Sequence, residues 1–239
     1  MLEITEKRLA SLLWVLKNKN KTWSVFELTK GVAKMQGIED HRVYKKNKTV
    51  PTVDIALTYT PTLSFVKELE KNGFLHKDRK TQEYGVSRAP DLVRLISLAR
   101  PFNSLNSLNY HSSLDFQKKL SLLGKIAGKQ LSYAFTVFAG SELYRPYVKT
   151  DAVHAYVLES EIKEWEKALL HEGFLKAEKR EANVFLIPTK QESIFSKAEK
   201  VKGYHVAPVP ILLSDLLSFG GLGEEQGSFL LEEWLNNRI

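Results

Sequence analysis

The segment Thr60–Arg88 constrains the fold of this chain more than any other part of its sequence. It opens with Pro61, and proline suits the first position of a helix, where its missing N–H is not needed. The apolar residues that follow at helical spacing are Phe65, Val66 and Leu69. Gly73 then predicts the end of the helix, because glycine adopts the left-handed conformation at little cost.

Two short strand patterns follow this glycine. Residues 74–76 and 83–86 are each expected to form a strand, and the charged residues 77–80 between them are expected to form the tip of a hairpin. A helix, a glycine stop and a charged hairpin are typical of the recognition helix and the wing of a winged helix-turn-helix domain. The sequence therefore predicts a DNA-binding unit.

The charge distribution agrees with this interpretation. Residues 1–100 contain 19 Lys and Arg against 11 Asp and Glu, a net charge of +8, whereas residues 101–239 contain 16 against 17, a net charge of −1. Clustered cations favour nucleic-acid binding because they replace the counterions of the phosphates. The first 100 residues, which include the predicted recognition helix, therefore hold all of the net positive charge.

The residues predicted to contact DNA are polar side chains of this helix and its entry, together with the cations of the hairpin tip. They are Thr58, Tyr59, Thr60, Thr62, Ser64, Lys67, Lys71, Lys77, Arg79 and Lys80. A helix needs such a polar face to meet base edges and phosphates in the major groove, which is about 12 Å wide. The alternative is that the face and the tip are simply solvated.

The remaining patterns divide the chain into two domains. Helices are expected at 4–18, 23–36 and 89–99, with a polar insertion at 37–55, and Thr5 and Thr22 are candidate helix caps. The Asn- and Ser-rich stretch 101–113 is the predicted linker. The predicted domains are a winged helix-turn-helix domain at 1–100 and an α/β domain at 101–239, so the fold class is α+β.

The second half alternates helix and strand patterns. Helices are expected at 114–127, 131–143, 160–172, 209–219 and 223–236. Strands are expected at 152–158, 174–175, 184–187 and 204–206.

No constellation of residues indicates catalysis. The chain has no cysteine, its six histidines are not at metal-ligand spacing, and it lacks a phosphate-binding loop. We therefore expect no catalytic residue, no metal and no cofactor, and interpret the protein as a non-enzyme.

One pattern favours an enzyme instead. Gly140–Ser141 followed by the strand at 152–158 is similar to the start of a nucleotidyltransferase site, where alternating carboxylates of the strand hold magnesium. Here the corresponding positions are His154 and Tyr156, with Asp151 before the strand. Because the carboxylate pair is missing, the second domain is predicted to be a degenerate nucleotidyltransferase-like scaffold. An active enzyme would instead depend on magnesium and on Asp151.

Three stretches together resemble the AbiEi antitoxin family of type IV toxin–antitoxin systems, and archaeal winged-helix regulators of the same layout. They are the helix and glycine stop at 60–75, the segment 133–157 and the closing segment 206–235. In the last of these, the matching residues are Asp215, Gly221, Gly223, Glu224 and Glu225. The resemblance implies a winged helix that binds and represses the promoter of its own operon, and a second domain that helps to neutralise a nucleotidyltransferase toxin.

The expected partners are double-stranded DNA, a cognate nucleotidyltransferase toxin and a second copy of the chain in a homodimer. A third interpretation is a protein-interaction module without a specific DNA target. No apolar run reaches about 18 residues and the N-terminus lacks a signal-peptide pattern, so we expect a cytoplasmic protein without a membrane span.

Overall fold

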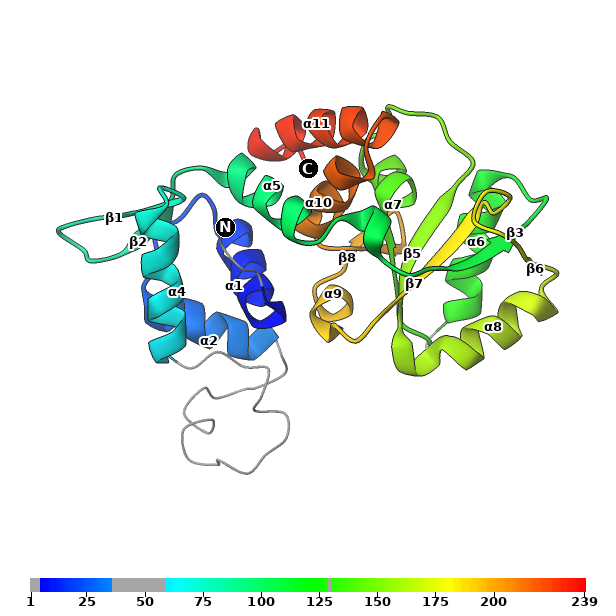
Figure 1. Cartoon of the computed structure of the whole chain (residues 1–239), viewed down its shortest axis with the longest axis horizontal. Helices are drawn as coiled ribbons and strands as arrows, with labels where there is room; N and C mark the ends of the chain where they lie inside the picture. Colours follow the sequence, from blue (N-terminus) through cyan, green and yellow to red (C-terminus); the bar gives the residue numbers. More distant parts are fainter. Residues whose placement is uncertain (1–4, 36–58, 129) are drawn as a thin grey trace, which may run out of the picture. The chain divides into compact units, whose positions relative to one another are not determined.

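The chain divides into two compact units, Met1–Ala99 and Arg100–Ile239, which we call the N-terminal and the C-terminal unit (Figure 1). The computed structural model describes residues 5–35, 59–128 and 130–239. Both units mix helices and strands, and the C-terminal unit is built on a mixed sheet. The boundary between the two units lies between Ala99 and Arg100. Within the described ranges, no helix is both long and apolar enough to cross a membrane.

In its described residues, the N-terminal unit has three helices before a hairpin and one helix after it. Its elements are α1 (Glu6–Lys17), α2 (Val25–Met35), α4 (Tyr59–Lys71), β1 (Leu75–Lys77), β2 (Tyr84–Val86) and α5 (Ala89–Ala99). Thr5 caps α1 by accepting the Arg8 amide at 3.4 Å, as expected. The expected cap Thr22 is wrong, because Ser24 begins α2: its hydroxyl accepts the Glu27 amide, and the Glu27 carboxylate accepts the Ser24 amide at 2.7 Å.

The apolar positions predicted from helical spacing form the core of this unit. They are Leu9, Leu12, Leu13, Leu16, Val25, Leu28, Val32, Phe65, Val66 and Leu69, and all of them are buried. Helices α1 and α2 approach closely where Gly31 meets Trp14. A Cβ atom on Gly31 would lie 1.8 Å from the indole Nε1 of Trp14, so only glycine fits there. The predicted insertion at 37–55 lies outside the described residues.

The hairpin is attached to the helices through one residue that precedes α2. Trp23 and Tyr84 exchange both backbone hydrogen bonds, at 2.9 and 2.8 Å, and β2 pairs antiparallel with β1. The order across this small sheet is therefore Trp23, β2, β1. Gly73 ends α4 with a φ of 74°, as the sequence predicted.

The C-terminal unit contains a seven-stranded sheet in the order β6-β3-β7-β5-β4-β9-β8 (Figure 1). Its strands are β3 (Leu108–His111), β4 (Tyr133–Thr136), β5 (Val153–Leu158), β6 (Leu175–Lys176), β7 (Val184–Thr189), β8 (Glu199–Val201) and β9 (Tyr204–Val206). The pairs β5–β7 and β4–β9 are parallel, and the other neighbours are antiparallel. The sheet is therefore mixed.

The helices of this unit pack in two groups. They are η2 (Phe102–Ser104), α6 (Phe116–Ala127), α7 (Val137–Tyr144), η3 (Glu159–Glu161), α8 (Ile162–His171), α9 (Glu192–Ser196), α10 (Val209–Phe219) and α11 (Leu222–Leu235). Helix α6 packs with α8, whereas α10 packs with α7, α11 and η2. Where α10 and α11 meet, a Cβ atom on Gly223 would lie 2.9 Å from the Leu216 carbonyl oxygen, so this glycine allows the close approach.

Two predictions for this unit are wrong. The expected linker at 101–113 instead contains η2 and the strand β3, which lies inside the sheet between β6 and β7. The expected helix at 131–143 is the strand β4 followed by α7, because a continuous apolar run such as 133–135 does not distinguish a buried strand from a helix by spacing. Gly140 and Ser141 lie within α7 and not in a turn.

Candidate nucleic-acid interface

Helix α4 separates an apolar face from a polar one. Its exposed residues are Tyr59, Thr60, Pro61, Ser64, Lys67 and Lys71, and the sequence predicted all of them except Pro61 as DNA contacts. Thr62 is a correction: its side chain is fully buried, because position 62 lies one helical turn before Phe65 and Val66 and shares their face. Thr58 lies outside the described residues.

The hairpin tip is shaped by an aspartate. The carboxylate of Asp78 accepts the backbone amides of Lys80 at 2.7 Å and Thr81 at 3.0 Å. These amides, that of Thr81 first, hold the pKa of Asp78 below its usual range. Gln82 follows in the left-handed region, with a φ of 60°, and returns the chain to β2. The Asp78 carboxylate therefore stabilises the turn that carries the neighbouring cations.

The cations of the helix and the tip face solvent, and the Nζ of Lys77 also lies over the Tyr84 ring, 5.6 Å from its centroid. Lys67, Lys71, Lys77, Arg79 and Lys80 are all exposed, and none forms an ion pair with any residue in the described ranges. Ion pairs of this unit involve other residues; for example, Arg8 on α1 pairs with Glu68 on α4 at 2.9 Å. Surface cations outside ion pairs bind phosphate without first breaking an ion pair, so this set of charges is suited to a polyanion.

The sequence did not indicate how the hairpin is anchored. Trp23 was assigned to a helix, but it lies in the small sheet and its ring stacks on Tyr84 at 5.9 Å. The available signal was the Ser24-x-x-Glu27 capping box, which places the start of the helix after the tryptophan. This anchor connects the tip to the core that also supports α4.

The nucleotidyltransferase-like positions do not come together as a metal site. Asp151 pairs with the buried Nζ of Lys119 at 2.6 Å and accepts from Asn183 at 3.0 Å. His154 stacks on Phe185, with ring centroids 4.6 Å apart. Within the described parts of the chain, no group of three potential metal-ligating residues gathers. The single carboxylate of the pattern is thus already engaged by a cation.

Tyr156 belongs to a buried polar cluster around Asp215. The carboxylate of Asp215 accepts Arg100 Nη1 at 2.8 Å, the Thr136 hydroxyl at 2.7 Å and the Tyr156 hydroxyl at 2.7 Å, and Arg100 also donates to the Tyr156 oxygen. Burial alone would lower the pKa of Arg100, but Asp215 and Tyr156 raise it above its usual value, so the guanidinium stays charged. Burial raises the pKa of Tyr156 well above its usual range, which keeps its hydroxyl protonated as a donor.

This cluster is structural in character. Both oxygens of the fully buried Asp215 carboxylate accept hydrogen bonds from described residues of the protein itself, so the carboxylate is engaged internally. Arg100 is the first residue of the C-terminal unit, and the ion pair fixes it to α10.

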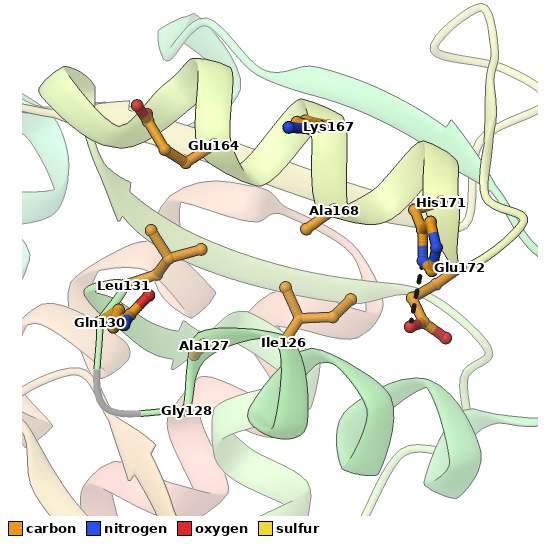
Figure 2. Close-up of a pocket in the computed structure, with 10 residues that line it drawn as sticks. All are labelled: Ile126, Ala127, Gly128, Gln130, Leu131, Glu164, Lys167, Ala168, His171 and Glu172. Atoms are coloured by element: carbon orange, nitrogen blue, oxygen red, sulfur yellow. Dashed lines mark ion pairs between the residues drawn. The ribbon is translucent and has the colours of Figure 1, made fainter.

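A hollow of about 590 Å³ lies between the end of α6 and α8 (Figure 2). Ile126, Leu131 and Ala168 face it, whereas Glu164 points away along the outer side of α8. The His171 ring lies near the Glu172 carboxylate, with Nδ1 and Oε1 3.7 Å apart, and both side chains are exposed. The charged groups along α8 do not converge on one point, so the hollow does not have the arrangement of a catalytic site.

No protein-family model, curated protein or solved structure matches this chain. Its function is therefore inferred from its own residues.

Proposed function

We propose that the N-terminal unit is a winged-helix domain that binds double-stranded DNA, and that the protein is a non-enzymatic transcriptional regulator. The observation that carries this proposal is the set of five exposed cations on α4 and on the hairpin tip, none of which forms an ion pair with a described residue. In this proposal α4 enters the major groove and the tip contacts a neighbouring phosphate or the minor groove.

The order of the elements supports a winged helix. Among the described residues, α1 and α2 precede α4, the hairpin follows it directly, and Trp23 provides the third strand position between α1 and α2. The hairpin and α4 are also joined through Gly73, where the Phe74 amide donates to the Leu69 carbonyl at 3.0 Å. Helix α4 and the hairpin tip are thus held in a fixed arrangement, which simultaneous contact of both with one duplex requires.

The chemistry of the polar face supports contact with DNA as well. Lys67 and Lys71 lie one turn apart on the same side of α4, with Ser64 one turn before Lys67. Lysines provide the phosphate contacts, and the hydroxyls of Ser64 and Thr60 are donors and acceptors for base edges. If all five cations contact phosphates, the logarithm of the association constant falls with the logarithm of salt concentration with a slope of about −4.5.

A charge reversal on α4 tests the proposal. Lys67→Glu with Lys71→Glu is expected to weaken binding to duplex DNA by ~100-fold or more, because it removes two phosphate contacts and adds repulsion. Fluorescence anisotropy with a labelled duplex at several salt concentrations measures both the affinity and the slope.

The chain offers a matched control. Lys163 and Lys167 on α8 are also exposed and one turn apart. Lys163→Glu with Lys167→Glu makes the same change in net charge and is expected to alter affinity by less than about threefold. Equal losses of DNA affinity in the two double variants, or unchanged affinity in both, would show that α4 is not the helix that contacts DNA.

For the C-terminal unit we propose a non-catalytic role that the resemblance to AbiEi-type antitoxins suggests, namely contact with a nucleotidyltransferase toxin. The engagement of Asp151 by Lys119 supports a silent scaffold over an enzyme. Co-purification with a toxin encoded beside this gene tests the partner, and light scattering of the purified chain tests the proposed homodimer.

A further inference from the structure

The C-terminal unit contains a second, smaller pocket of about 230 Å³. It lies between the segment 102–107, the strands β5 and β7, and the end of α10. Asn103 holds the first of these walls in place by donating to the Phe219 carbonyl at 3.0 Å, and the Phe102 amide donates to the Ser218 hydroxyl at 3.0 Å. The pocket is therefore bounded by hydrogen-bonded backbone and not by free side chains alone.

Aromatic rings form most of its walls. His154 stacks on Phe185 with an interplanar angle of 8°, and it meets Phe102 and Phe219 edge to face at 5.6 and 5.7 Å. Rings arranged in this way offer both faces and edges to a further ring. The volume exceeds the roughly 150 Å³ of a cavity that binds benzene but is below the range of about 300 Å³ and more for drug-sized ligands. A ligand of one substituted ring fits these limits.

His154 adds an unsatisfied polar group to this apolar wall. Its side chain is only 4% exposed, and Nδ1 has no hydrogen-bond partner among the described residues. Burial, with a smaller contribution from the Lys179 charge, lowers the pKa of His154 to about 3, so the ring is neutral and has one donor and one acceptor nitrogen. A buried polar atom without a partner costs stability. Nδ1 itself has almost no accessible surface, so the ring nitrogen that a ligand hydroxyl is expected to reach is Nε2.

Lys179 gives the pocket a positive rim. It is exposed and, within the described ranges, forms no ion pair, yet it lines the pocket and its charge acts on His154. An anionic group on the ligand would pair with this lysine while the ring occupies the aromatic walls.

We propose that this pocket binds a small aromatic carboxylate whose single ring carries a hydroxyl group. The carboxylate pairs with Lys179, the ring packs among Phe102, Phe185 and Phe219, and the hydroxyl bonds to His154. This inference concerns the C-terminal unit alone and stands whether or not the N-terminal unit binds DNA.

Isothermal titration calorimetry of the full chain with 3- and 4-hydroxybenzoate tests the pocket. At least one of the two acids is expected to bind with a Kd on the order of 0.1 mM, which is in the range for a ligand of this size. The uncharged 4-hydroxybenzamide and the non-aromatic cyclohexanecarboxylate are expected to bind at least about fivefold more weakly. No saturable binding of either hydroxybenzoate up to about 5 mM, or equal binding of all four compounds, would overturn the proposal.

Three variants locate the binding. Lys179→Gln is expected to weaken it by about threefold to fivefold, and Leu105→Trp, which fills the pocket from its half-buried wall, is expected to abolish it. Lys163→Gln removes another exposed lysine of the same unit and is expected to change nothing. A thermal melt confirms that each variant is folded. Unchanged binding in both Lys179→Gln and Leu105→Trp, or an equal loss in Lys163→Gln, places the ligand elsewhere and overturns the assignment.

Discussion

Replacing His154 with phenylalanine is expected to remove a large part of the acid sensitivity of the C-terminal unit. The imidazole is enclosed by aromatic rings, and the charged group that acts on it is Lys179. Burial is the larger cause and the lysine the smaller one, and together they lower the pKa of His154 to about 3. In the unfolded chain the same histidine titrates near ~6.5.

The direction of the effect follows from where the proton binds. Between pH 6.5 and pH 3 the unfolded chain binds a proton that folded His154 does not, so the free energy of unfolding falls as the pH falls through this window. The contribution of His154 is fully present above about pH 6.5. From these two pKa values, the loss between pH 7 and pH 5 is ~2 kcal/mol.

Urea unfolding of the full chain at pH 7 and pH 5, followed by circular dichroism, measures this loss. His154→Phe keeps an aromatic ring in the stack but removes the titrating group, so its C-terminal transition is expected to lose ~2 kcal/mol less than that of the wild type. At pH 7 the variant is expected to be at least as stable as the wild type, because an unpartnered buried nitrogen is gone. Equal losses in both proteins between the two pH values would refute the reasoning.

Two further substitutions test the packing of each unit. Gly31→Ala is expected to destabilise the N-terminal unit by ~1 kcal/mol, because the added methyl group would collide with Trp14. Alanine is normally the better helix former, so a gain in stability by thermal melting would show that the contact with Trp14 is not tight. Thr136→Val removes one of the donors to Asp215 and is expected to cost ~2 kcal/mol by urea unfolding, whereas Thr136→Ser, which keeps the hydroxyl, is expected to restore most of it. If Thr136→Ser lowers the free energy of unfolding as much as Thr136→Val, the hydroxyl of Thr136 is not the cause of the loss.

Much of the N-terminal unit could be predicted because its signals are local. The spacing of Phe65, Val66 and Leu69 indicates which side of α4 is buried, and Gly73 indicates where the helix ends. Thr62 was predicted to contact DNA because its side chain is polar. Its position on the helix determines its exposure, and that position is buried. The exposure of the other described candidates on α4 followed from the same periodicity.

The C-terminal unit was less predictable because its organisation depends on residues far apart in the chain. Arg100 and Asp215 are separated by 115 positions, and no local pattern pairs them. The strand β3 was missed because Asn and Ser are common in loops, although Tyr110 within it is buried. Likewise, the small pocket combines three separate stretches around His154, so only the folded chain indicates it.

The central claim is that the N-terminal unit contacts duplex DNA through α4 and the hairpin tip, and photochemical cross-linking tests it most directly. The full chain is bound to a duplex selected from a random pool, irradiated and digested, and the cross-linked peptides are identified by mass spectrometry. We expect cross-links within residues 59–80, which include the exposed ring of Tyr59 and the five cations. Cross-links confined to residues 100–239 would contradict the claim.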